Sequence, residues 1–251
     1  MSARLTWPTG VGRHVLDVVD STMTEAARMA PTLSGPAWIL GLRQTAGRGR
    51  RGRAWVDPAG NFAATLVMRP ADPPERMALR SFVAALALHE TFVTVTGRAE
   101  PFALKWPNDV LLNGAKVAGI LLESSSASTG HLAIGIGVNL VSAPGGNEVE
   151  AGALRPVSLL SETGARVTPE EFLDILAPAF ARWEAQFATY GFGPIRTAWM
   201  ARAARLGETV MARAGTQSHE GRFIELDDQG ALILVTARGR VAIPAGEVFF
   251  G

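Results

Sequence analysis

The sequence contains no cysteine, which excludes disulfide bonds, thiolate metal sites and a cysteine nucleophile. It also lacks an excess of charge of one sign, because 24 Lys and Arg residues are balanced by 23 Asp and Glu residues. A domain dedicated to nucleic-acid binding is usually far more basic. The 4 histidines do not show the spacing that is typical of metal ligands.

Long apolar runs are missing as well. The longest uninterrupted one, Phe82–Leu88, is much shorter than the ~18 residues that indicate a membrane span. The N-terminus has no apolar region of the kind found in signal peptides. The 251 residues are 47% apolar, which is enough for a large packed domain, alone or with a small one. We therefore expect a cytoplasmic protein without a membrane segment.

Apolar periodicity predicts two structural regions. In residues 1–206 we expect strands and helices in alternation, and Thr22 with Glu25 has capping-box spacing at the first helix. Residues 207–251 are expected to form a small β-barrel domain. The predicted strands are Val15–Val19, Trp38–Leu42, Asn61–Met68, His131–Leu140, Thr209–Arg213, Gly221–Leu226, Ala231–Thr236 and Arg240–Ile243, and the predicted helices are Met23–Met29, Pro73–Thr96, Pro169–Tyr190 and Pro194–Arg205.

Three glycines and four arginines alternate between Gly47 and Arg53. Glycine lets the backbone approach a ligand closely, and arginine supplies a planar cation with several donors. This composition predicts a loop that clamps an anion, most simply a phosphate. Because the arginines repel one another, we expect the loop to become ordered only around its anion. A solvated basic loop or an RNA-binding segment is the alternative interpretation.

A second cluster is Lys105-Trp106-Pro107-Asn108-Asp109, followed by Lys116. Asn113 and Gly114 lie between two apolar runs, which is typical of a tight hairpin. The hairpin brings Lys116 back toward Asp109, where a lysine would neutralise the charge that develops in phosphoryl or nucleotidyl transfer. The alternative is a turn anchored by Trp106 with an exposed lysine.

The segment His131–Leu140 alternates with unusual regularity. Its apolar side chains fall on one face, and the other face carries Ala133, Gly135, Gly137 and Asn139. This nearly bare face is either a floor for a flat ligand, with Asn139 at a purine edge, or a surface packed under a helix. Asp20-Ser21-Thr22 has hydroxyls at a helix start, which either cap the helix or bind a polar ligand group.

Taken in this order, the motifs resemble those of biotin–protein ligases. The resemblance spans residues 20–140 and departs from the family at Met23, where asparagine is usual. The tail from Gly207 resembles the family's small C-terminal domain only in length and pattern. The matching segments are Asp20–Met23, Gln44–Trp55, Lys105–Asp109, Lys116, Ala118–Glu123 and Gly135–Asn139.

The resemblance implies an α+β fold related to class II aminoacyl-tRNA synthetases, with a mixed sheet, flanking helices and a C-terminal SH3-like β-barrel. It implies ATP, Mg²⁺ and biotin as reactants, with biotinyl-5′-AMP as the intermediate. The final acceptor would be a lysine of the biotin carboxyl carrier domain of acetyl-CoA carboxylase or a related carboxylase. Since Met1 leads almost directly into the first motif, we expect a monofunctional ligase without an N-terminal DNA-binding domain. Monomer and homodimer both stay open.

The resemblance also assigns roles residue by residue, without naming metal ligands. For catalysis it implies Lys116 and Arg48, and we add the hypothesis that Asp109 helps the acceptor amine by deprotonation or orientation. Arg51 and Arg53 receive no role and are expected to be solvent-exposed. The implied biotin-binding residues are Ser21, Thr22, Gln44, Arg48, Arg50, Lys116 and Gly119, and the implied nucleotide-binding residues are Arg48, Arg50, Trp55, Asn108, Lys116 and Asn139.

Two alternatives remain at this stage. A lipoate–protein ligase or octanoyltransferase would share the fold and accept a longer acyl chain, although the intact Arg/Gly loop favours biotin. An RNA-binding module would use the same loop, but the near-neutral net charge of +1 disfavours it.

Overall fold

The structure, a computed structural model, describes residues 6–56, 58–125, 130–145 and 154–250. Its larger unit is built on a seven-stranded sheet in the order β1-β2-β3-β7-β6-β5-β4. β1 and β2 are parallel and the other pairs are antiparallel, so the sheet is mixed, as predicted. The strands are β1 (Gly12–Leu16), β2 (Ala37–Gly41), β3 (Phe62–Met68), β4 (Phe102–Lys105), β5 (Asp109–Leu112), β6 (Ala115–Ser124) and β7 (Leu132–Val138).

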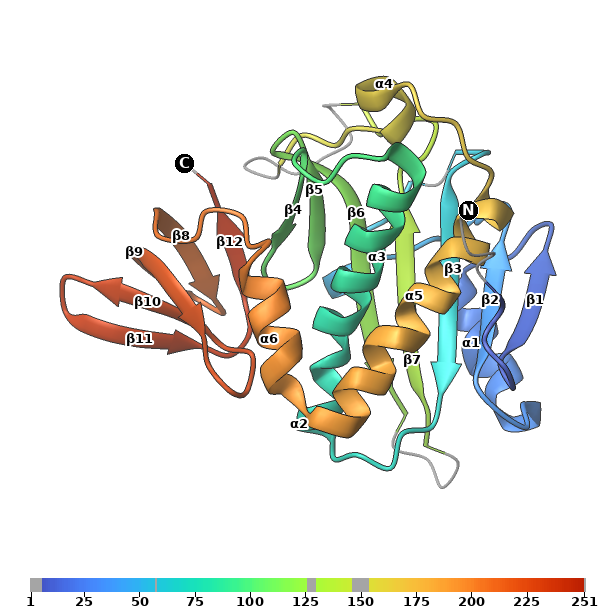
Figure 1. Cartoon of the computed structure of the whole chain (residues 1–251), viewed down its shortest axis with the longest axis horizontal. Helices are drawn as coiled ribbons and strands as arrows, with labels where there is room; N and C mark the ends of the chain where they lie inside the picture. Colours follow the sequence, from blue (N-terminus) through green and yellow to red (C-terminus); the bar gives the residue numbers. More distant parts are fainter. Residues whose placement is uncertain (1–5, 57, 126–129, 146–153, 251) are drawn as a thin grey trace.

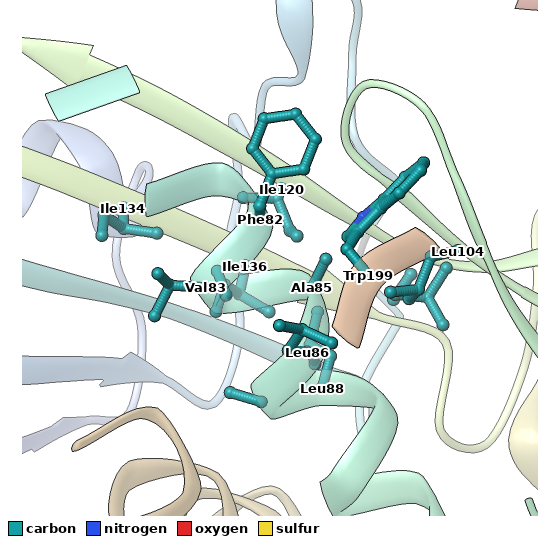
Figure 2. Close-up of a cluster of buried hydrophobic side chains, with 14 of the residues drawn as sticks. Phe82, Val83, Ala85, Leu86, Leu88, Leu104, Ile120, Ile134, Ile136 and Trp199 are labelled. Carbon is teal, nitrogen blue, oxygen red and sulfur yellow. The ribbon is translucent and has the colours of Figure 1, made fainter. Parts of the chain in front are cut away.

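Helices cover both faces of this sheet unequally. α3 (Arg80–Thr96) and α5 (Pro169–Tyr190) cross one face, and α6 (Phe192–Met200) packs beside them (Figure 1). The side chains of α3 pack against those of β6 and β7 in the main core (Figure 2). Among the described α-helices, α1 (Thr22–Met29) is the one that packs on the other face. The short helices are α2 (Pro74–Ala78) and α4 (Leu159–Thr163), with 3₁₀ turns at Ala30–Thr32 and Arg50–Gly52.

The regular alternation in β7 explains why the two faces differ. Ile134 and Ile136 belong to the core under α3, whereas Ala133 belongs to the smaller cluster under α1. The residues on the second face are small, so this side of the sheet keeps space that bulky side chains would fill. The site described below occupies that space.

A second sheet follows α6, with five antiparallel strands in the order β11-β10-β9-β8-β12. Its β9–β10 turn docks on the first unit: the Trp106 indole donates to the Gly230 carbonyl at 3.0 Å, and Arg196 pairs with Asp228 at 2.8 Å. Closure of this sheet into an SH3-like barrel, the domain boundary at 206/207 and the relation to class II synthetases stay predictions. The strands are β8 (Thr209–Ala214), β9 (Gln217–Leu226), β10 (Leu232–Thr236), β11 (Gly239–Ile243) and β12 (Glu247–Phe249).

Several local predictions were wrong. The first strand starts and ends earlier than predicted, the long second helix is divided into α2 and α3, and α6 ends at Met200. β4, β12 and α4 were not predicted, because each has at most five residues and shows no clear periodicity. The capping box of Thr22 and Glu25 is absent; Ser21 is the N-cap, and its side chain makes no cap hydrogen bond.

The segment Pro74–Thr96 is long and apolar enough to cross a membrane by length and composition, with a mean hydropathy of 1.3. However, 67% of its most apolar window is buried inside the fold. It is the central helix of the core, so its apolar character is explained by packing.

His89 provides a test of this core through pH. Burial lowers the pKa of this imidazole to about 4 from an ordinary 6.5. On acidification the unfolded chain therefore takes up the proton first, and the free energy of unfolding falls as the pH drops from 6.5 to 4. The loss is about 3 kcal/mol. His89→Leu should flatten this part of the stability profile, measured by urea unfolding across that pH range.

The matched control is His219→Leu, on β9 of the second sheet. The free energy of unfolding of this variant should fall between pH 6.5 and 4 as it does in the wild type. If wild type and His89→Leu lose stability equally on acidification, the buried neutral histidine is not the cause.

Candidate active site

A cavity of about 420 Å³ lies on the sheet face that α3 and α5 leave uncovered. The start of α1, the Arg/Gly loop, β5, β6, β7 and the last residues of the second sheet line it. Every site residue predicted from the sequence reaches this cavity, namely Ser21, Thr22, Gln44, Arg48, Arg50, Trp55, Asn108, Asp109, Lys116, Gly119 and Asn139.

One end of the cavity is neutral and polar. The backbone N–H of Thr22 donates to Gln44 Oε1 at 2.8 Å, and its hydroxyl lies 3.2 Å from the same oxygen. Thr65 on β3 donates to the Thr22 hydroxyl at 2.9 Å. Gln44 thus satisfies the helix start in place of the missing capping box. Together with the buried hydroxyl of Ser21, these groups form a fixed set of donors and acceptors.

The floor of the cavity is the small-residue face of β7, and two protein side chains lie on it. A Cβ added to Gly135 would approach Met23 Sδ to 2.7 Å, and one added to Gly137 would approach Trp55 Cε2 to 2.4 Å. Gly135 therefore packs under α1, whereas Gly137 makes room for the indole of Trp55. Of the two alternatives left open for this face, packing under a helix is found at Gly135, where Met23 of α1 lies, and the Trp55 indole lies on Gly137.

Two buried polar atoms beside this floor lack a hydrogen-bond partner among the described residues. They are Trp55 Nε1, a donor, and Asn139 Oδ1, an acceptor. The amide nitrogen of Asn139 donates to the Val157 carbonyl at 3.1 Å, which fixes the side chain. An unsatisfied buried polar group costs free energy, so both atoms favour a polar ligand at this end of the cavity.

A buried carboxylate organises the cationic end. Lys116 Nζ lies 2.8 Å from Asp109 Oδ1, and Lys105 Nζ lies 3.7 Å from Asp109 Oδ2. Burial raises the pKa of the Asp109 carboxyl, but Lys116, Lys105 and Arg50 outweigh this effect and hold the pKa below its usual value. Asp109 is therefore a fixed anion that holds Lys116 in place, and it is a weak base.

Lys105 is the second lysine of this cluster. It is buried, and burial lowers the pKa of its ammonium. Its Nζ also lies 5.6 Å from the centre of the Phe250 ring, near the end of the second sheet. Lys105 and Lys116 are the only lysines in the whole sequence. The chain thus places both of its primary side-chain amines in one cavity.

The Arg/Gly loop is a small hairpin over the cavity. Arg48 and Ala54 form an isolated bridge, and the Gly49 N–H donates to the Arg53 carbonyl at 2.7 Å. Arg48 pairs with Glu123 at 2.7 Å and donates to the Thr24 hydroxyl at 3.0 Å. Protein oxygens hold the loop in this hairpin, and the expectation that it becomes ordered around its anion stays a prediction.

Arg50 points into the site and is half-buried. Its guanidinium donates to Asn108 Oδ1 at 3.2 Å and to the Gly246 carbonyl at 3.1 Å. Burial lowers the pKa of Arg50, although Asp109 and Glu247 oppose this effect. Arginine stays protonated nevertheless, so Arg50 is a cation inside the cavity.

Arg51 and Arg53 are exposed as predicted, with 49% and 38% of their side chains accessible, but both are also ion-paired. Arg51 pairs with Glu247 at 3.0 Å, and Arg53 pairs with it at 2.6 Å. Sequence reasoning also missed Glu247 as a residue of the site. The available signal was the cluster of four arginines, whose charge requires carboxylates to balance it.

The donor set does not fit a resident metal ion. Among the described residues, no group of three His, Asp or Glu side chains is placed to hold one. The carboxylates of Asp109, Glu123 and Glu247 that surround the cavity are all paired with Lys or Arg.

Comparison with known proteins supports the interpretation of this site. Residues 15–139 match the model of the Biotin/lipoate A/B protein ligase family, and residues 206–251 match the Biotin protein ligase C terminal domain. The chain is 62% identical to a biotin–[acetyl-CoA-carboxylase] ligase of Paracoccus denitrificans, covering 92% of this chain and 98% of that one. It is 31% identical to the enzyme of the same name from Mycobacterium tuberculosis, over 95% and 90% of the two chains.

Solved structures agree. The biotin protein ligase of Aquifex aeolicus in complex with biotin and ATP matches with a TM-score of 0.80 and 27% identity, over 94% of this chain and 97% of that chain. The mixed sheet with its helices and the antiparallel C-terminal sheet are thus a biotin ligase fold. The sequence, the fold and the cavity lead to one conclusion: this chain belongs to the biotin protein ligase family.

Proposed function

We propose that the chain joins biotin to a lysine of a biotin carboxyl carrier domain at the expense of ATP. The first step forms biotinyl-5′-AMP and releases pyrophosphate, and the second step transfers the biotinyl group to the lysine amine and releases AMP. The acceptor domain belongs to acetyl-CoA carboxylase or a related carboxylase, and the reaction takes place in the cytoplasm.

One observation carries this proposal. A neutral polar end, a small-residue floor and a cationic end meet in one cavity. Biotin has the matching parts, namely a neutral ureido ring, an apolar chain and a carboxylate. Ser21, Thr22 and Gln44 would bind the ureido ring, and Gly119 on β6 lets the chain lie close to the sheet. The carboxylate then lies among Arg48, Arg50 and Lys116.

The charges of this end explain the first step. The biotin carboxylate attacks the α-phosphorus of ATP, and both groups are anionic, so their approach is unfavourable in water. Lys116 and the two arginines offset this repulsion and stabilise the charge that develops on the α-phosphate. To reach the reactants, Arg48 exchanges Glu123 for a substrate oxygen.

The orphaned polar atoms Trp55 Nε1 and Asn139 Oδ1 support a place for the base of the nucleotide beside β7. Asn139 Oδ1 accepts a hydrogen bond from the exocyclic amine of adenine, and Asn108 lies at the neighbouring wall beside Arg50. The indole of Trp55 offers a flat surface for stacking. Mg²⁺ comes with ATP, bound by the phosphates, as part of the substrate.

In the second step, the carrier lysine attacks the acyl carbon and AMP leaves. The closed loop excludes water, which would otherwise hydrolyse the mixed anhydride. Because its pKa is lowered, Asp109 acts by orienting cations, first Lys116 and then the incoming carrier lysine, which loses a proton to water so that its neutral amine attacks. The division into a catalytic domain, residues 1–206, and a C-terminal domain, residues 207–251, completes the proposal.

Incubation with ATP, Mg²⁺, biotin and a carrier domain of acetyl-CoA carboxylase tests the activity. Mass spectrometry should show one biotinyl addition on a single carrier lysine. Lipoic acid in place of biotin separates the related ligases, and transfer of lipoyl alone would overturn the proposal.

Lys116→Ala should stop the first step. Removal of a cation at the developing charge should slow biotin-dependent pyrophosphate release by on the order of 100-fold or more, measured with a coupled phosphate assay. Lys116→Arg keeps the charge and should retain more activity than Lys116→Ala. Wild-type adenylate formation by the alanine variant would contradict the role of Lys116.

Gly137→Ala should act on the nucleotide more than on biotin. The added methyl group meets the Trp55 indole at 2.4 Å, so the stacking surface must move. We expect the KM for ATP to rise about tenfold, since stacking of a base on an aromatic ring is worth about 1–3 kcal/mol. Gly193→Ala is the matched control, because no atom lies within 4 Å of its added Cβ. Equal effects of the two variants would contradict this arrangement.

Asp109→Asn distinguishes orientation from deprotonation. If Asp109 holds Lys116, the variant should impair both adenylate formation and transfer from isolated biotinyl-5′-AMP. If Asp109 is a base for the carrier lysine, only transfer should fail. The pH profile of the transfer rate should then no longer show the titration of a group with a low pKa. Single-turnover measurements of the two steps separate these outcomes.

A further inference from the structure

The Arg/Gly loop is attached to the second sheet through one carboxylate. Glu247, the first residue of β12, accepts hydrogen bonds from Arg53 at 2.6 and 3.2 Å and from Arg51 at 3.0 Å. The preceding residue, Gly246, also contacts the loop, because its carbonyl oxygen accepts a hydrogen bond from Arg50 at 3.1 Å. These contacts join residues that lie 194 to 196 positions apart.

Glu247 is well placed to hold the loop still. Its strand pairs with β8, where Glu247 is opposite Arg213, so its backbone is part of the second sheet. The carboxylate also lines the cavity. Burial raises the pKa of Glu247, but Arg53, Arg51 and Arg50 outweigh this and keep the pKa below its usual value. The carboxylate is therefore charged throughout the neutral range.

The loop backbone is bent to make this contact. Arg51 has φ 59° and ψ 25°, a left-handed conformation that costs a residue with a side chain roughly 1 kcal/mol. The conformation occurs at the tip of the loop, where Arg51 and Arg53 both reach Glu247. The ion pairs thus stabilise a turn that the backbone alone does not favour.

We propose that Glu247 is a positioning residue that latches the Arg/Gly loop over the cavity through Arg51 and Arg53. The latch determines how long the loop stays closed, and hence how long the acyl-adenylate is retained before the carrier arrives. The retention of the adenylate rests on the proposed function, whereas the latch itself does not.

The strength of the latch fits a loop that must open in every cycle. The side chains of Arg51, Arg53 and Glu247 are 49%, 38% and 21% exposed, so water and salt weaken each pair. A forked, two-arginine contact is stronger than a single exposed pair, but substrate can still enter. Arg51 and Arg53 act on the loop, and Arg48 and Arg50 remain for the reactants.

Limited trypsin digestion tests the latch without any substrate. Cleavage after Arg48 requires the loop to open. Glu247→Gln keeps the shape of the side chain and removes its charge, and it should speed this cleavage roughly five- to tenfold, as expected for loss of a charged pair in the loop. Glu225→Gln is the matched control, because Glu225 pairs with Arg240 inside the second sheet. It should leave the rate unchanged.

A second variant changes the loop side of the latch, where the arginines that pair with Glu247 lie. Arg51→Gln with Arg53→Gln removes the same ion pairs, leaves the second sheet intact and preserves the bond after Arg48. It should also speed cleavage there. Wild-type cleavage rates in both Glu247→Gln and this double variant would overturn the latch.

Retention is measured by loading enzyme with labelled biotinyl-5′-AMP and following its loss by filtration. Glu247→Gln should lose the label roughly five- to tenfold faster than wild type and Glu225→Gln. If Glu247→Gln loses the labelled adenylate at the wild-type rate although trypsin cleaves its loop faster, the role of the latch in retention is overturned. If wild type binds no adenylate, the proposed function fails, and the digestion still decides on the latch.

Discussion

Repulsion between like charges is the constraint on which the site depends. Arg48, Arg50, Lys105 and Lys116 all line one cavity, and burial lowers the pKa of two of these cations. Such a cluster is unstable without anions. The chain supplies them at three points, with Asp109 inside the cavity, Glu123 beside α1 and Glu247 on the second sheet.

This arrangement connects the fold to the chemistry. Each carboxylate comes from a different strand, so the sheet and the second unit must both be in place before the cations can gather. In the proposed reaction, a substrate anion enters a site whose charges are already positioned, and it replaces the Glu123 carboxylate at Arg48. Positioned charges of this kind need little reorganisation during the reaction.

The sequence predicted the local parts of this site well. The motifs around Gln44, Asp109 and Lys116 are short, and a hairpin turn that Asn113 and Gly114 identify brings Asp109 and Lys116 together. The alternation in β7 correctly predicted which face belongs to the core. It could not predict that Met23 and Trp55 would cover the glycines, because that depends on how α1 and the loop pack on the sheet.

The least predictable contact was that of Glu247. β12 has only three residues, and a strand this short shows no usable period. Its partners lie almost two hundred positions earlier in the chain, and no local pattern connects segments at that distance. The four arginines showed that acids were needed, but only the packing of the two units identifies them.

The distribution of lysine has a consequence for an enzyme that makes a reactive acyl donor. Both lysines of the chain pair with Asp109 in the cavity, and the remaining strongly basic residues are arginines, which stay protonated and do not attack acyl groups. A biotinyl-5′-AMP molecule that escapes therefore meets no exposed lysine on the surface of its own enzyme. The lysine amines of the chain are thus confined to the cavity.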